Sequence, residues 1–181
     1  MNRRLVVSAA VLLAAAVVAV GLYLFQPWRV FTSSTVTEDL PAVAPPVRQS
    51  APQSAQPPVA PSEAAPRELA AGRLISHEHA SSGAVRILEL ADGKRILRFE
   101  GLDTSDGPDL RVWLTNAPVI EGAAGWYVFD DGAYLDLGAL KANKGDQNYE
   151  IPAGANLADY TSVSIWCARF AVSFAAAGLT N

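Results

Sequence analysis

The chain has 181 residues and a formal net charge of −4, because 14 lysines and arginines stand against 18 aspartates and glutamates. This acidic balance argues against a nucleic-acid partner, since binding to phosphates requires a basic surface. The single cysteine excludes an intramolecular disulfide and every zinc or iron–sulfur site that is built from several cysteines. Half of the residues are hydrophobic but only 18% are charged, so an apolar segment is concentrated somewhere in the chain.

The apolar segment lies at the amino terminus. Residues 5–25 carry no charge, follow Arg3 and Arg4, and have the length of a helix that crosses a bilayer. The run is longer than the apolar region of a cleaved signal peptide and therefore predicts a transmembrane signal anchor, with cleavage as the alternative. The two arginines predict that residues 1–4 are a cytoplasmic tip. We thus expect a single-pass protein of the cell membrane whose carboxyl-terminal part faces outside the cytoplasm.

Residues 26–71 are predicted to be an extracytoplasmic linker rich in proline and alanine. Eight of the twelve prolines lie in residues 38–71, where aromatic residues are absent. Such a composition cannot bury enough apolar surface to offset the entropy of ordering, and proline favours extended backbone. We expect a disordered spacer that lifts a domain off the membrane.

Residues 72–181 form the only candidate domain, and their hydrophobic pattern has the period of a β-strand. Residues 83–90 and 94–100 alternate around Asp92 and Gly93, a dipeptide typical of a tight hairpin turn. Further short strands are expected near residues 110–114, 134–137, 148–151, 162–167 and 171–175. In residues 110–114 the alternation predicts that Leu110 points inward and Trp113 outward. The spacing of about ten residues predicts an all-β domain, an antiparallel β-sandwich or flattened barrel.

Cys167 is the first candidate for chemistry. Strand alternation places it on the same face as Val163 and Ile165, as expected of a buried thiol. A lone thiol outside the cytoplasm is nevertheless exposed to oxidation, and this makes a reactive or ligating role the second interpretation. Arg169, two positions further, would share that face and favour the thiolate.

Two histidines and three aspartates give weaker signals. His77 and His79 are two positions apart and could form a metal or haem pair, or simply end a solvated strand. Asp103, Asp106 and Asp109 flank a Gly-Pro turn and could gather around calcium, although aspartate is common in turns. No Gly-x-Ser-x-Gly, P-loop or His-Glu-x-x-His motif supports a hydrolase.

Four ordered blocks of the domain resemble the DM-thirteen family. They read HASSG at 79–83, TSDGPDLRVWL at 104–114, LGALKANKGDQNYEIP at 137–152 and YTSVSIWCARFAVSF at 160–174. The resemblance covers residues 72–181 and implies an electron-transfer domain. It also implies that Cys167 is a redox thiol or the ligand of a prosthetic group such as haem, with His79 as a second ligand. A redox partner protein would then be expected beside the membrane.

A second hypothesis is a non-catalytic domain that binds a sugar or a protein of the cell envelope or assists envelope assembly. Its loops at 103–109 and 141–149 are rich in aspartate, asparagine, lysine and glycine, which suits recognition. The side chains expected to contact such a ligand are Asp106, Asp109, Asn143 and Asn148.

Overall fold

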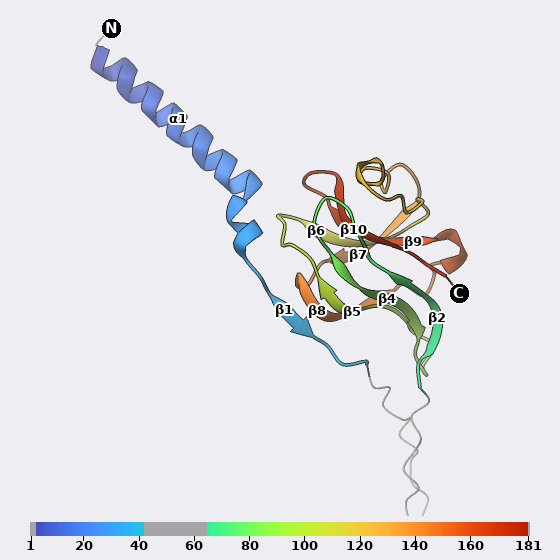
Figure 1. Cartoon of the computed structure of the whole chain (residues 1–181). Helices are drawn as coiled ribbons and strands as arrows, with labels where there is room; N and C mark the ends of the chain where they lie inside the picture. The colour runs from blue at the N-terminus through green and yellow to red at the C-terminus, as the bar shows by residue number, and fades with distance from the viewer. Residues whose placement is uncertain (1–2, 42–64, 181) are drawn as a thin grey trace, which may run out of the picture.

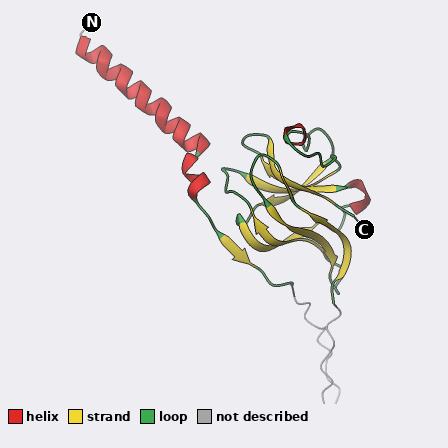
Figure 2. Cartoon of the chain, in the orientation of Figure 1, coloured by secondary structure: helices red, strands yellow, loops and turns green. Residues whose placement is uncertain are grey.

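The computed structural model describes residues 3–41 and 65–180. It begins with α1 (Arg3–Phe25) and a short 3₁₀ helix, η1 (Pro27–Phe31), which lead to the β domain (Figures 1 and 2). Within the described part, one helical stretch, Val6–Phe25, is long and apolar enough to cross a membrane.

The domain is a sandwich of two five-stranded sheets, as the sequence predicts. The first sheet has the order β1 (Thr35–Thr37), β8 (Lys144–Ile151), β5 (Arg95–Asp103), β4 (Ser82–Glu89), β2 (Arg67–Arg73). The second has the order β3 (Ile75–Ser76), β10 (Val172–Gly178), β9 (Ser162–Cys167), β6 (Leu110–Thr115), β7 (Tyr134–Ala139). Two further 3₁₀ turns are η2 (Ala123–Gly125) and η3 (Leu157–Asp159). All described strand pairs are antiparallel except β1 with β8.

The hairpin at Asp92 and Gly93 is confirmed, and it sets the register of β4 against β5. Gly93 has a φ of 81° and its N–H donates to the Leu90 carbonyl at 2.9 Å. Because a glycine accepts this left-handed backbone without strain, the turn closes tightly and pairs Glu89 with Arg95.

Apolar side chains of both sheets fill the space between them. This inner cluster includes Val85, Phe99, Val112, Val163 and Ile165, none of which has more than trace exposure. Burial of these side chains is the main stabilising contribution of the fold.

Trp113 lies on the outer face of the second sheet, as predicted, but this face is buried as well. Residues 116–133 fold over this face, and Phe129 from that segment packs with Trp113 and Trp166 in an outer cluster. The indole rings of Trp113 and Trp166 stack with their centroids 5.1 Å apart, and Tyr134 stacks on Trp113 at 4.0 Å. Period-two alternation identifies the two faces of a strand but cannot tell whether a loop covers the second one.

His77 is buried at the border of the outer cluster. Its Nε2 lies 3.1 Å from the Ile120 carbonyl, which can only accept, so Nε2 carries the proton and Nδ1 accepts from the Ser173 hydroxyl at 2.9 Å. Loss of hydration lowers the pKa of His77, and the hydrogen bond to Ile120 opposes this effect only in part. Burial therefore favours the neutral imidazole.

A short segment ahead of the Pro/Ala-rich region is attached to the first sheet. We call residues 34–39 the strap. Its strand β1 runs parallel to β8, and Gly145 of β8 leaves room for it, because a Cβ there would lie 2.0 Å from the Val36 carbonyl oxygen. The Glu38 carboxylate accepts from Lys141 Nζ at 2.8 Å and from the Asn148 N–H at 2.7 Å. These contacts lower the pKa of Glu38, with the Lys141 hydrogen bond as the largest cause.

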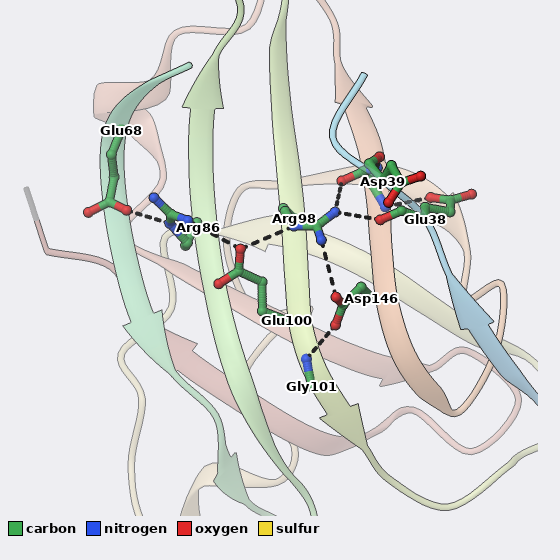
Figure 3. A network of polar contacts seen from close by, with 9 residues as sticks. Glu38, Asp39, Glu68, Arg86, Arg98, Glu100, Gly101 and Asp146 are labelled. Carbon is green, nitrogen blue, oxygen red and sulfur yellow. Dashed lines mark hydrogen bonds and ion pairs between the residues drawn. The ribbon is translucent and has the colours of Figure 1, made fainter. Parts of the chain in front are cut away.

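A chain of ion pairs crosses the outer face of the first sheet from β2 to β8 (Figure 3). It runs from Glu68 to Arg86, then to Glu100 and Arg98, and ends at Asp146. Arg98 is only 7% exposed and pairs with two carboxylates, at 3.1 Å and 3.2 Å. Because a buried guanidinium is costly without partners, this arrangement constrains the register of β5 against β8.

Arg98 also connects this chain of charges to the strap. Its Nη1 donates to the Glu38 carbonyl at 2.9 Å, and Asn148 Nδ2 donates to the Asp39 carbonyl at 2.8 Å (Figure 3). The strap is thus held through backbone as well as side-chain groups.

The ordered structure extends beyond the predicted domain boundary at Gly72, which lies inside β2. The sequence between α1 and the domain also contains β1, so the predicted linker of residues 26–71 has strands at both ends. Most of the Pro/Ala-rich part, residues 42–64, lies outside the described residues. Strands β1 and β2 lie at opposite edges of the first sheet.

We predict that a fragment of residues 66–181 is more stable than one of residues 72–181, by about 2 kcal/mol. The shorter fragment loses most of the β2 pairing with β4 and the packing of Leu69 and Ala70 on the inner cluster. Urea denaturation followed by circular dichroism measures the difference. Both fragments should melt cooperatively with a β spectrum, and equal unfolding midpoints would show that β2 adds nothing.

We predict a loss of stability in the window below about pH 6.5 that depends on His77. A folded-state pKa below the unfolded value of about 6.5 means that the unfolded chain binds more protons, so stability is present above that pH and falls with acidification. In His77→Gln the slope over this window should flatten, although the variant starts less stable. An unchanged slope in His77→Gln would contradict the assignment.

Candidate functional site

Cys167 is the last residue of β9 and its exposure is 0%. It is paired with Leu110 on β6 and with Val172 on β10, and its side chain belongs to the inner cluster. The predicted alignment with Val163 and Ile165 is therefore observed. The thiol lies inside the sandwich at the end that carries the β9–β10 turn.

Burial determines the protonation state of Cys167. Loss of hydration raises the pKa of the thiol, and the negative charge of Asp109 adds to this. The backbone amides of Phe170, Arg169 and Asp109 act in the opposite direction, because N–H groups stabilise a negative sulfur. The net effect is a raised pKa, so Cys167 is a protonated thiol at neutral pH.

Strand alternation predicts that Arg169 shares the face of Cys167, and this prediction is wrong. Strand β9 ends at Cys167, so alternation no longer applies two positions further. Arg169 lies in the turn, and its Nη1 donates to the carbonyl oxygen of Leu24 in α1 at 3.3 Å.

The two histidines have different surroundings. His79 packs on the ring of Phe174 with centroids 4.0 Å apart, and its Nε2 lies 2.5 Å from the carboxylate of Glu78. His77 contacts Ser173 and Phe129 on the outer side of β10, whereas Phe174 belongs to the inner cluster. The described residues give the two imidazoles no common partner, and the predicted histidine pair is not assembled.

The side chains arranged around Cys167 do not fit a ligated haem or metal. The sulfur has no open side, since its neighbours Leu110 and Val172 close the inner cluster around it. Among the described residues, no group of three or more histidine, cysteine, aspartate or glutamate side chains is close enough together to hold a metal.

A cavity of about 370 Å³ lies between the end of α1 and the domain, next to Cys167. We call it the junction cavity. Val172, which pairs with Cys167 in the sheet, lines it together with Phe170 and His79. Phe25 and Arg29 close it from the helix side. Local sequence could not predict that these two residues contact the domain, because contacts between distant segments leave no local pattern.

The four loop residues predicted to bind a ligand have separate roles. Asn143 is buried, accepts from the Ser34 N–H at 2.7 Å and donates to the Thr104 carbonyl at 2.8 Å. Asn148 accepts from Arg98 and donates to the strap. Both asparagines therefore support the fold.

The aspartates of the 103–109 loop do not converge on one point. Asp103 pairs with Lys144, Asp106 with Arg29 at 3.2 Å, and Asp109 lies 4.0 Å from Arg111. Asp106, Asp109 and Asn143 do line a second, more polar cavity of about 260 Å³. This polar cavity is the part of the surface that suits the sugar- or protein-binding alternative, whereas the separate ion pairs argue against a calcium site.

Comparison with known proteins assigns the domain to a family. Neither the curated proteins nor the solved structures that were searched gave a match. The family model described as "Electron transfer DM13" matches residues 73–179, which include every strand of the sandwich after β2 and more than half of the chain. The protein therefore belongs to the DM13 electron-transfer domain family, with an apolar helix ahead of its β domain.

Proposed function

We propose that this protein is a membrane-tethered electron-transfer module whose β domain faces outside the cytoplasm. The observation that carries the proposal is the family match over residues 73–179, joined to a helix long enough to cross a membrane. Arg3 and Arg4 precede that helix, and cytoplasmic retention of such residues would place the domain on the opposite side. A redox partner protein would meet the domain at the membrane surface.

We further propose that Cys167 is the redox-active group of the domain, acting as a thiol. It is the only cysteine of the chain, and burial shields it from random oxidation outside the cytoplasm. Three backbone amides close to the sulfur would favour any state in which it gains negative charge, and hydrogen bonds of this kind tune sulfur redox centres. Access would require the β9–β10 turn to open.

Binding of a sugar or protein is the second candidate function. The polar cavity favours it, because Asp106 and Asp109 supply acceptors beside the backbone of Gly107 and Leu140. Asp106 is already engaged by Arg29 and by the Gly107 N–H, however, which leaves less of its hydrogen-bonding capacity for a ligand. We therefore favour the electron-transfer role.

The first test concerns topology. In intact spheroplasts we expect added protease to digest the β domain and leave a small fragment that contains α1 in the membrane pellet. An antibody to the domain and a cytosolic marker protein, as the control for intact cells, follow the digestion. A domain that is protected until the membrane is lysed would contradict the proposed orientation.

The second test concerns the role of Cys167. In isolated membranes, diamide with added glutathione should convert Cys167 reversibly into a mixed disulfide, with diamide taking up the two electrons and two protons, and dithiothreitol should return the thiol. Alkylation in denaturant traps the fraction of reduced Cys167 at each stage. Without denaturant, alkylation should be slow at neutral pH and accelerate only above the ordinary cysteine pKa of about 8.5, because burial raises the pKa. A thiol that stays reduced throughout, in protein shown to be folded, would sink the redox role.

Variants separate the chemical role of Cys167 from its packing. Cys167→Ser buries a hydroxyl and should cost about 1–3 kcal/mol, whereas Cys167→Ala leaves only a small cavity and should cost less. The raised pKa also means that the folded state keeps a proton that the unfolded state loses, so wild-type stability should fall as the pH rises above about 8.5. Cys167→Ala should lack this alkaline component, and thermal melts across the pH range measure it.

A further inference from the structure

The junction cavity has walls from both the helix and the domain. Six of its lining side chains determine its character: Phe25, Arg29, His79, Tyr127, Phe170 and Phe174. Four of the six are aromatic. A volume of about 370 Å³ lies in the range of small-molecule sites and suits a single substituted ring.

Direct contacts hold the helix side of the cavity in place. The rings of Phe25 and Phe170 stack with centroids 5.7 Å apart and an interplanar angle of 19°. Arg29 Nη1 donates to the Asp106 carboxylate and to the Gly107 carbonyl, both at 3.2 Å. These contacts bring the last turn of α1 against the domain, so the cavity lies where a membrane-spanning α1 would leave the apolar part of the bilayer.

His79 supplies the polar group of the cavity. Because the Glu78 carboxylate accepts at Nε2, a neutral His79 carries its proton there and presents Nδ1 as an acceptor. Among the described residues Nδ1 has no hydrogen-bond partner, and the side chain is 24% exposed. A ligand hydroxyl can therefore donate to Nδ1 while its ring packs near Phe174.

The charges of the cavity restrict the ligand further. Arg29 is paired with Asp106, and Glu78 contributes a further negative charge, so the three charged side chains sum to −1. A phosphate or carboxylate ligand would find no free cation here, and it would be repelled. The lining suits a neutral aromatic ring that bears hydroxyl groups and arrives from the bilayer.

We propose that the junction cavity binds the head group of a membrane-borne quinol. The aromatic side chains enclose the ring, His79 Nδ1 accepts from one hydroxyl, and the isoprenoid or alkyl tail stays among the lipids beside α1. The biological reason for such binding rests on the proposed electron-transfer role, since a quinol is a neutral electron carrier of the membrane. Binding itself does not depend on Cys167.

Photolabelling of the full-length protein tests the site. The protein is placed in phosphatidylcholine nanodiscs with an azido-benzoquinol that carries a decyl tail, illuminated, and mapped by mass spectrometry. We expect labels on peptides that contain Tyr127 or Phe170, and competition by excess unlabelled decylbenzoquinol. Labels confined to the lipid-facing part of α1 would overturn the proposal. Labelling that excess unlabelled quinol does not reduce would also overturn it, because it would show that phospholipid fills the cavity.

Variants identify the group that holds the ring. His79→Phe keeps an aromatic ring against Phe174 but removes the acceptor, and it should weaken competition by decylbenzoquinol about tenfold, as expected for one lost hydrogen bond. His79→Asn restores an acceptor and should recover part of the affinity. Tyr134→Phe, on the opposite sheet edge, is the matched control and should change nothing. Equal affinity in His79→Phe and wild type, with melts that show both folded, would overturn the role of His79.

Cys167→Ala separates this proposal from the electron-transfer role. We expect the variant to be labelled like wild type, because the thiol does not line the cavity. Saturable labelling together with a Cys167 that does not undergo redox cycling would support the quinol site and contradict the redox role of the thiol. Redox cycling of Cys167 without saturable labelling would do the reverse.

Discussion

The parallel pairing of β1 with β8 holds the β domain against the end of α1. Nine residues separate Phe25 from Thr35, so once the strap is attached the first sheet cannot move far from the helix. The ion pair of Arg29 with Asp106 and the stacking of Phe25 on Phe170 are short-range contacts that depend on this proximity. The strap thus helps these contacts to hold the two walls of the junction cavity together.

Burial of both faces of the second sheet has a different effect on each of its polar groups. It leaves Cys167 protonated and enclosed, and it keeps His77 neutral. A low dielectric always disfavours the charged form, so the pKa of the thiol rises while that of the imidazole falls. The group with a free polar atom at the surface is His79, which lies at the rim of the sheet where water can reach it.

Local sequence patterns predicted the strands, the hairpin at Gly93 and the burial of Cys167, because alternation and turn chemistry act over a few residues. They failed where the fold brings distant segments together. Trp113 is buried by a loop with no period of its own, and Arg169 lies beyond the end of its strand. Asn148 binds Asp39 of the strap, whose three-residue strand β1 is too short to be recognised from sequence. The cavity could not be predicted, since its helix-side wall (Phe25, Gln26 and Arg29) is far in sequence from its domain-side wall (residues 78–174).

The strap also changes the length scale on which the protein operates. The chain from Phe25 to Thr35 can span at most about 35 Å, whereas a fully extended spacer of the Pro/Ala-rich region would reach roughly 100 Å. With α1 in a membrane, the domain is therefore confined to a thin layer above the bilayer. A partner anchored in the same bilayer would meet it by lateral diffusion, at an effective concentration far above that of a freely dissolved protein.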